Sequence, residues 1–299
     1  MEQIIKIDSI DDYNKLYGFQ TWHPLVAVID MSTLTDYPFP KEVTYSYGLY
    51  ALFLKQTYCG DMTYGRMPYD YQEGTITSFA PGQVVHIKHL DNFKPNALGL
   101  LFHPDLIKGT SLGQGIKQYS FFAYSSREAL HLSEQEKMIY QDCLSKIKME
   151  VERPIDKHSK RLICRNIELL LDYCMRFYDR QFITRENVNT DLLAKFESEL
   201  DKYYQEQQVI RNGLPSVKYF ADKCFLSPNY FGDLVKRETG RTAQELIQNK
   251  VIDLAKELLL GTNKTINEIS LELGFQYSQH FNRYFKRKVG IPPNEFRKK

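Results

Sequence analysis

Residues 265–290 read TINEISLELGFQYSQHFNRYFKRKVG, and residues 216–240 read SVKYFADKCFLSPNYFGDLVKRETG. The two stretches share one pattern of apolar, small and basic positions when one additional residue is allowed in the second turn. The matched pairs are Val217 and Ile266, Phe220 and Ile269, Ala221 and Ser270, Cys224 and Leu273, Phe231 and Phe281, Val235 and Phe285, Lys236-Arg237 and Lys286-Arg287, and Gly240 and Gly290. This internal repeat indicates one supersecondary unit that is present twice.

Each copy predicts two short helices joined by a turn. The first helix has apolar residues at positions i, i+3 and i+7, and a break follows at Ser227-Pro228 or at Gly274-Phe275. The second helix turns its apolar residues inward and ends at a glycine, which readily adopts the left-handed conformation of a helix stop. This is a helix-turn-helix, whose second helix can lie in the major groove of DNA.

The segment between the copies is TAQELIQNKVIDLAKELLL, residues 242–260, and it contains neither Pro nor Gly. As a helix it would be about 28 Å long. Two helix-turn-helix units must sit about 34 Å apart to enter successive major grooves on one face of DNA. A spacer of nearly this length favours a reader of two half-sites over a purely structural pair of helical hairpins.

The charge of the chain is unevenly distributed. Residues 213–299 contain 15 Lys and Arg against 9 Asp and Glu, whereas the remainder contains 24 against 28. Only Glu295 opposes the basic residues near the end, which are Arg283, Lys286, Arg287, Lys288, Arg297, Lys298 and Lys299. A basic segment after a mildly acidic one indicates that the C-terminal part meets a polyanion.

The preceding part of the chain predicts strands and then helices. Apolar runs separated by Gly, Pro and Asn turns extend from Leu25 to Phe102 and are typical of a β-barrel or sandwich. Ser133 and Glu136 form a capping box at the start of one helix. A second helix carries a wide apolar stripe, which suits packing on the barrel or on a second copy; it comprises Ile163, Ile167, Leu170, Leu171, Cys174 and Tyr178.

The segment 181–190, QFITRENVNT, is polar and aperiodic, so we place the domain boundary there. The expected fold class is α+β. A β-barrel with trailing helices would occupy residues 1–185. An all-α domain, with two helix-turn-helix units joined by a linker helix, would occupy residues 191–299.

Composition narrows the class of protein. No apolar run approaches the roughly 20 residues of a membrane span, and the N-terminus lacks the pattern of a secretion signal. The cysteines are odd in number and form no CxxC pair; they are Cys59, Cys143, Cys164, Cys174 and Cys224. This pattern indicates reduced thiols and a cytoplasmic location.

Residues 214–299 resemble the DNA-binding domain of the AraC/XylS family of transcription regulators. The stretches INEISLELGF and FNRYFKRKVGIPPNEFR carry the likeness, with Gly290, Pro293, Phe296 and Arg297 at the positions of the family signature. The stretch EGTITSFAPGQVVHI is similar to the strand–turn–strand of cupin-like barrels. The resemblance implies a homodimer that binds double-stranded operator DNA through this domain. It also implies a sensor or dimerisation domain before it, with a small-molecule effector and RNA polymerase as candidate partners.

The resemblance also implies site residues. Base edges would be read by Ser278, Gln279, Asn282 and Arg283 in the second unit, and by Asn229, Gly232 and Asp233 in the first. Asp233 departs from the family, which commonly has a basic residue there, so the first unit could instead serve mainly to position the protein. Phosphates would be contacted by Lys236, Lys286, Arg287 and the helix N-termini at Ser216 and Thr265.

Two other patterns suggest chemistry but have simpler explanations. Residues 109–113 match G-x-S-x-G, the hydrolase nucleophile elbow, yet HPDLIK separates them from the apparent strand. The histidines His86, His89 and His103 lack metal-site spacing, because residues three apart on a regular strand point to opposite faces. We therefore expect no catalytic residue, no metal and no cofactor.

Tyrosines are crowded through the predicted strands: Tyr45, Tyr47, Tyr50, Tyr58, Tyr64, Tyr69 and Tyr71. Their rings could stack on a sugar or an aromatic effector, although packing between strands is the commoner use. Two alternatives to a regulator stay open. One is a cupin-type enzyme that its C-terminal domain targets to DNA, and the other is a constitutive architectural protein.

Overall fold

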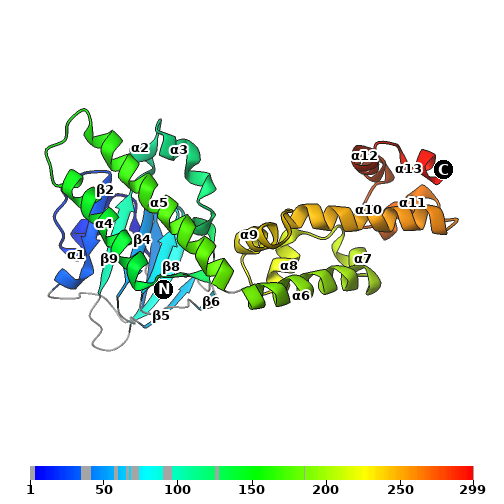
Figure 1. Cartoon of the computed structure of the whole chain (residues 1–299), viewed down its shortest axis with the longest axis horizontal. Helices are drawn as coiled ribbons and strands as arrows, with labels where there is room; N and C mark the ends of the chain where they lie inside the picture. Colours follow the sequence, from blue (N-terminus) through cyan, green and yellow to red (C-terminus); the bar gives the residue numbers. More distant parts are fainter. Residues whose placement is uncertain are drawn as a thin grey trace. The chain divides into compact units, whose positions relative to one another are not determined.

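The computed structural model describes residues 4–34, 42–56, 60–64, 67–68, 74–89, 96–124, 128–184 and 186–298. The chain divides into two compact units, Met1–Thr184 and Arg185–Lys299 (Figure 1). The first contains sheets covered by helices and the second is all-helical, so the predicted α+β class is confirmed.

The strands of the first unit form two separate sheets in its described residues. One sheet has the order β1(Ile4–Ile7), β3(Glu42–Tyr47), β8(Gln83–His89), β5(Gly60–Tyr64) and β6(Met67–Pro68). The other has the order β10(Leu130–His131), β7(Thr75–Phe79), β4(Tyr50–Lys55), β9(Ala97–Phe102) and β2(Val26–Asp30). Only β1 and β3 pair in parallel among these described strands.

The described strands form two sheets and not the closed β-barrel that the sequence predicts, and the turn between β7 and β8 connects the two sheets. The two strands flanking Pro81-Gly82 belong to different sheets, so the predicted strand–turn–strand crosses between them. Gly82 has φ +88°, a left-handed conformation that glycine adopts without strain. The Gln83 side chain holds the turn, because its Nε2 donates to Phe122 O (2.9 Å) and its Oε1 accepts from Ala80 N (2.8 Å).

Tyrosine rings fill part of the core of the first unit. Tyr45 and Tyr47 are buried, and Tyr47 stacks on Phe79 with ring centroids 5.5 Å apart. Tyr17, on α1(Ile10–Tyr17), donates its hydroxyl to that of Tyr45 at 3.1 Å. These tyrosines therefore pack the core. The side chains of Tyr58, Tyr64, Tyr69 and Tyr71 lie outside the described residues.

Helices complete the first unit. They include α2(Pro104–Ile107), α3(Ser111–Gly115), α4(Glu134–Val151) and α5(Ser159–Thr184). The predicted capping box at Ser133 and Glu136 starts α4, and the whole predicted stripe of α5 is buried. Cys143, Cys164 and Cys174 are buried as predicted, and burial raises the pKa of each thiol. Cys59 lies outside the described residues.

The second unit consists of helices around two aromatic clusters. Its elements are α6(Glu186–Gln205), α7(Gln208–Asn212), α8(Val217–Lys223), α9(Pro228–Thr239), α10(Ala243–Gly261), α11(Ile266–Glu272), α12(Ser278–Val289) and α13(Pro293–Arg297). Phe196 of α6 makes edge-to-face contacts with Phe220 of α8 and Phe231 of α9. Phe281 and Phe285 of α12 pack against the C-terminal half of α10. No helix of the described residues is long and apolar enough to cross a membrane.

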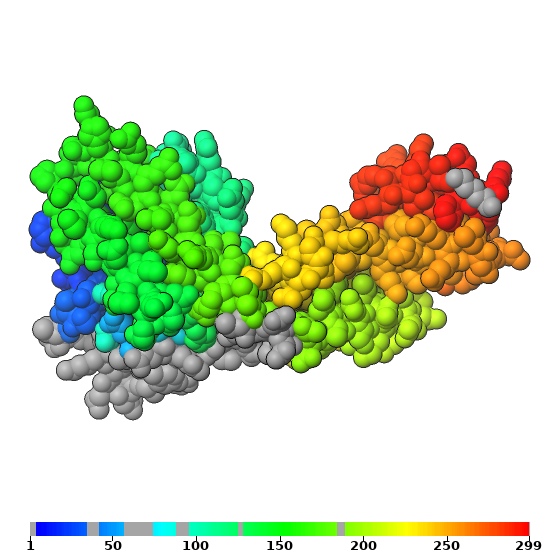
Figure 2. Space-filling model, viewed as in Figure 1, coloured from blue at the N-terminus to red at the C-terminus, as the bar shows by residue number. Residues whose placement is uncertain are grey.

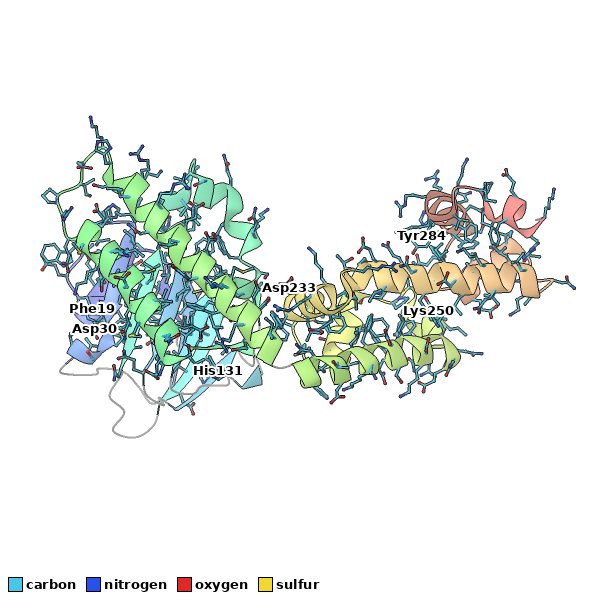
Figure 3. The ribbon with its side chains drawn as sticks, in the orientation of Figure 1. Phe19, Asp30, His131, Asp233, Lys250 and Tyr284 are labelled. Atoms are coloured by element: carbon cyan, nitrogen blue, oxygen red, sulfur yellow. The ribbon has the colours of Figure 1, made fainter. Side chains whose placement is uncertain are left out.

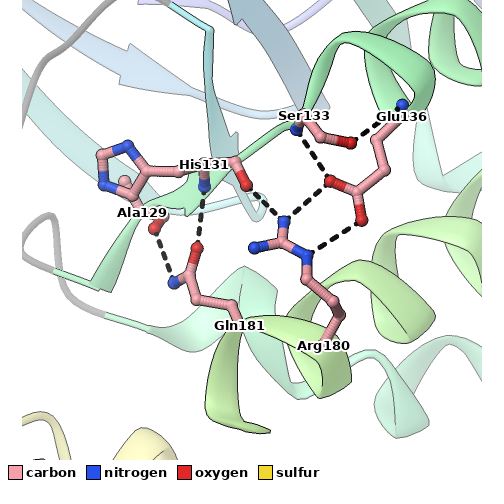
Figure 4. Close-up of polar contacts among 6 residues, drawn as sticks. All are labelled: Ala129, His131, Ser133, Glu136, Arg180 and Gln181. Carbon is pink, nitrogen blue, oxygen red and sulfur yellow. Dashed lines mark hydrogen bonds and ion pairs between the residues drawn. The ribbon is translucent and has the colours of Figure 1, made fainter. Parts of the chain in front are cut away.

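The segment 181–190, which was predicted to be irregular, is helical apart from residue 185, which lies outside the described residues. The reason is tertiary. Gln181 Nε2 donates to Ala129 O (3.1 Å) and its Oε1 accepts from His131 N (2.9 Å), so this buried amide is satisfied by the strand end (Figure 4). Phe182 is also buried. Gln181 is therefore a buried, hydrogen-bonded residue of α5 and not part of a loop.

Arg180 links the same end of α5 to the start of α4 (Figure 4). Its Nε and Nη2 donate to the two carboxylate oxygens of Glu136 (3.0 and 2.7 Å), and Nη2 also donates to His131 O (2.6 Å). Burial alone would raise the pKa of the Glu136 carboxyl. Hydrogen bonds from Arg180 and Ser133 outweigh it and hold that pKa below its usual value.

Replacing this arginine should destabilise the first unit. Arg180→Ala removes the guanidinium that pairs with Glu136 and one hydrogen-bond donor to His131 O. We expect a loss of about 1–2 kcal/mol, allowing for solvent screening of the partly exposed guanidinium. The measurement is chemical denaturation of the full chain at neutral pH.

Acid provides a second measurement for the same variant. A carboxyl with a lowered pKa contributes stability that is complete above the ordinary value of 4.5 and is lost as pH falls through the folded-state pKa. Stability should therefore fall less steeply below pH 4.5 in Arg180→Ala than in the wild type. Arg165→Ala is the control, because Arg165 forms an exposed pair with Glu168 on the same helix. Equal losses in both variants would contradict the role given to Arg180.

Candidate nucleic-acid interface

The sequence repeat is also a repeat of backbone geometry. Helices α8 and α11 each have 7 residues, and α9 and α12 each have 12. In both turns a backbone N–H returns to the first helix, from Leu226 to Ala221 O (3.0 Å) and from Phe275 to Ser270 O (2.9 Å). Both second helices end at a left-handed glycine, Gly240 or Gly290. Two helix-turn-helix units are therefore present.

The turns of the two helix-turn-helix units differ in length by one residue and also in the residue at their left-handed position. Gly274 has φ +91°, and a Cβ there would lie 2.5 Å from a methyl of Val209, so this turn requires glycine. Phe225 occupies the matching position with φ +59° and is 66% exposed. A bulky residue in the left-handed region is strained. The break predicted at Ser227-Pro228 marks the start of α9, and matching Phe225 to Gly274 would have located the strained residue.

Helix α10 joins the units as the predicted spacer. It has 19 residues, and a capping box of Thr242 and Glu245 fixes its start. It packs against α8 and α9 of the first helix-turn-helix, and against α11 of the second one and the following α13 (Figure 1). The ion pair between Lys250 and Asp201 adds a link to α6. The two units therefore share one uninterrupted helix as their support.

The four signature residues Gly290, Pro293, Phe296 and Arg297 hold the second helix-turn-helix in place against α10. Gly290 ends α12, and the buried Pro293 starts α13. The Phe296 ring meets Phe285 edge-on at 5.5 Å. Arg297 Nε donates to Leu259 O of α10 at 3.2 Å. Their roles are therefore structural, and the residues that face outward must be sought on α12 itself.

Helix α12 has a basic outer face. It is at the surface beside α13 (Figure 2), and Gln279, Arg283, Lys286 and Arg287 are exposed. Ser278 and Asn282 are half-buried. Arg283 and Lys286 make no ion pair with another described residue, so both cations are available to a ligand. The guanidinium of Arg287 lies 5.8 Å from the Tyr284 ring, whose hydroxyl is bonded to Gln248 O of α10.

Helix α9 has a different outer face. Asn229 and Lys236 are exposed, and Gly232 and Asp233 are half-buried. Figure 3 shows Asp233 on α9 and Tyr284 on α12. A Cβ added to Gly232 would meet no atom of the described part of the chain within 4 Å. The two second helices thus share a backbone but present opposite charges at the matched positions Asp233 and Arg283.

The two helix N-termini predicted to bind phosphate are unlike each other. Ser216 caps α8 by accepting from Tyr219 N (3.2 Å), and the first turn of α8 contains no acidic residue. At Thr265 the Glu268 carboxylate accepts the backbone N–H at 2.6 Å. That hydrogen bond lowers the pKa of Glu268. An anion at Thr265 would therefore meet a carboxylate, whereas one at Ser216 would not.

Ser111 of the G-x-S-x-G match and two of the three histidines make hydrogen bonds that are structural. Ser111 Oγ donates to Glu168 at 3.2 Å, and α2 separates β9 from Gly109. His86 Nδ1 is bonded to Thr44 Oγ1 (2.9 Å), and His103 caps α2. The His89 side chain lies outside the described residues. Those residues contain no group of three His, Cys, Asp or Glu that could hold a metal.

Comparison with known proteins finds a family model and several relatives that match this chain. A family model described as a helix-turn-helix domain matches residues 220–299. The chain is 32% identical to the uncharacterized HTH-type transcriptional regulator YobQ of Bacillus subtilis, over 27% of this chain and 34% of YobQ. It is 32% identical to the transposon Tn10 TetD protein of Escherichia coli, over 48% of this chain and 91% of TetD.

Among solved structures, the chain is similar to the C-terminal domain of the response regulator yesN from Fusobacterium nucleatum. The identity is 24% and the TM-score 0.32, over 36% of this chain and 98% of that one. The chain spans between about a quarter and a half of the length of the first curated relatives that it matches.

The strained turn at Phe225 gives a test of the first helix-turn-helix. Phe225→Gly should stabilise the protein by about 1 kcal/mol, because glycine adopts the left-handed conformation without a Cβ clash. Phe225→Ala is the matched control, since it removes the ring and its contact with Lys195 but keeps the strain. Denaturant unfolding compares the two. If they are equally stable, the backbone of this turn is unstrained.

Proposed function

Because this chain belongs to the AraC/XylS family of transcription regulators, we propose that it binds operator DNA with both helix-turn-helix units and thereby regulates transcription. The observation that carries the proposal is the duplicated unit on one continuous helix. Helix α10 rises about 28 Å over its 19 residues, close to the helical repeat of DNA that separates successive major grooves.

Base reading is assigned to the outward faces of α9 and α12. On α12, Arg283 suits guanine and Gln279 and Asn282 suit adenine, with Ser278 beside them. On α9 the corresponding residues are Asn229, Gly232 and Asp233. The exposed side chains of Gln279 and Arg283 support this assignment, because base edges must be reached from the surface.

Phosphate contacts are assigned to residues beside these faces. Lys236, Lys286 and Arg287 are exposed in the last turns of α9 and α12, where a cation can reach the backbone that flanks the groove. Of the two helix N-termini, Ser216 is the better phosphate site, because Glu268 already accepts from Thr265 N.

The sheet-containing unit, Met1–Thr184, acts by dimerisation. Helix α5 has a solvent-facing stripe with the seven-residue spacing of a coiled-coil seam, formed by Leu162, Asn166, Leu169, Tyr173 and Arg176. Leu162 and Leu169 are 41% and 42% exposed, although the other face of the same helix is buried. A second copy of α5 would cover both. Dimerisation is favoured over an effector because the described tyrosines pack the core.

In vitro selection from random duplexes, with the full chain, tests the proposed function. The enriched sequences should contain two half-sites one helical turn apart, and protection mapping should cover two successive major grooves on one face. No enrichment, or protection of a single groove, would contradict the proposal.

Arg283 and Lys286 form a matched pair of variants. Arg283→Ala should abolish the preference at one base pair of the selected operator, a loss of about 1–3 kcal/mol of discrimination. Lys286→Ala should weaken binding to all sequences alike and reduce the slope of log affinity against log salt by about 0.9. Titration of the operator and its single-base variants at several salt concentrations measures both. A uniform loss in Arg283→Ala would make that residue a phosphate contact only.

The dimer seam has its own test. Leu169→Lys places a charge in the stripe and should convert the dimer to a monomer in sedimentation velocity, because an unpaired buried charge is costly. Ile4→Lys is the control, since Ile4 is also an exposed apolar residue but lies on strand β1 and not on α5. The seam is ruled out if the Leu169→Lys protein sediments as the wild type does.

A further inference from the structure

Gly232 lies in the interior of α9, where glycine is a poor helix former. The described residues do not require it, because its φ is not left-handed and a Cβ would meet none of their atoms within 4 Å. The matching position of α12 holds Asn282, so the same backbone accepts a side chain there. The protein thus keeps a destabilising residue that its own packing does not need.

A glycine on an open helix face allows another molecule to approach the backbone closely. Gly232 lies three and four residues from Asn229 and Lys236, on the face assigned to DNA, and next to Asp233. We propose that α9 lies closer to the base edges than α12 does, with Gly232 against the floor of the major groove. This inference rests on the proposed function.

Asp233 identifies what α9 meets at that depth. A carboxylate beside Gly232 repels phosphate, so this face fits base edges better than the DNA backbone. In the major groove a carboxylate accepts a hydrogen bond from the exocyclic amine of cytosine. The matching residue of α12, Arg283, donates to guanine. Each half-site therefore requires a G·C pair, which α9 reads from its cytosine and α12 from its guanine.

Gly232→Ala and Gly261→Ala form the test, in the full chain. Both glycines are helical and have open space for a Cβ, but Gly261 lies at the end of α10, outside both recognition helices. Both variants should therefore unfold at a higher temperature than the wild type. Only Gly232→Ala should lose affinity for the selected operator, by at least tenfold, with an unchanged salt slope.

Asp233→Asn tests the second part. Asparagine pairs with adenine, so repeating the selection should replace the required cytosine by adenine at one position of one half-site. Equal operator affinity of the two glycine variants would overturn the close approach, and an unchanged base preference in Asp233→Asn would overturn the cytosine contact. If the wild type selects no DNA at all, the proposed function fails as well; if it does, these outcomes concern α9 alone.

Discussion

The packing of other helices on the buried face of α10 is the interaction on which the all-helical unit, Arg185–Lys299, depends. Ile247, Val251, Ile252, Ala255 and Leu259 are all buried along this one helix. The first helix-turn-helix packs on its N-terminal half and the second on its C-terminal half. Because the helix is continuous, neither unit can shift without changing its contact with α10. The distance between the two outward faces is therefore set by helix geometry and not by a loop.

Local signals made much of this arrangement predictable. The repeat, the capping boxes at Ser133 and Thr242, and the glycine stops at Gly240 and Gly290 each depend on residues a few positions apart. The start of α10 is marked by the capping box at Thr242, and no Pro or Gly interrupts residues 242–260. All of these features except the Ser133 box lie in the candidate interface, which is why its elements could be placed from the sequence. The side-chain assignments within it remain predictions.

Other features depend on partners far away in the chain. The amide of Gln181 bonds to Ala129 and His131, about fifty residues earlier, and no local pattern announces a helix there. Strand alternation indicates which faces are buried but not which strands pair, so the crossing at Pro81-Gly82 was invisible. Phe225 belongs to neither group. Its left-handed conformation can be inferred from the sequence, but only by comparison with Gly274 at the matching position of the other copy.

The guanidinium of Arg297 closes the last turn of α10 through Leu259 O, 38 residues earlier in the chain. A substitution of Arg297 would therefore loosen the end of α10 and with it the support of the second helix-turn-helix. Binding assays on such a variant would understate the affinity for DNA although neither recognition helix was altered.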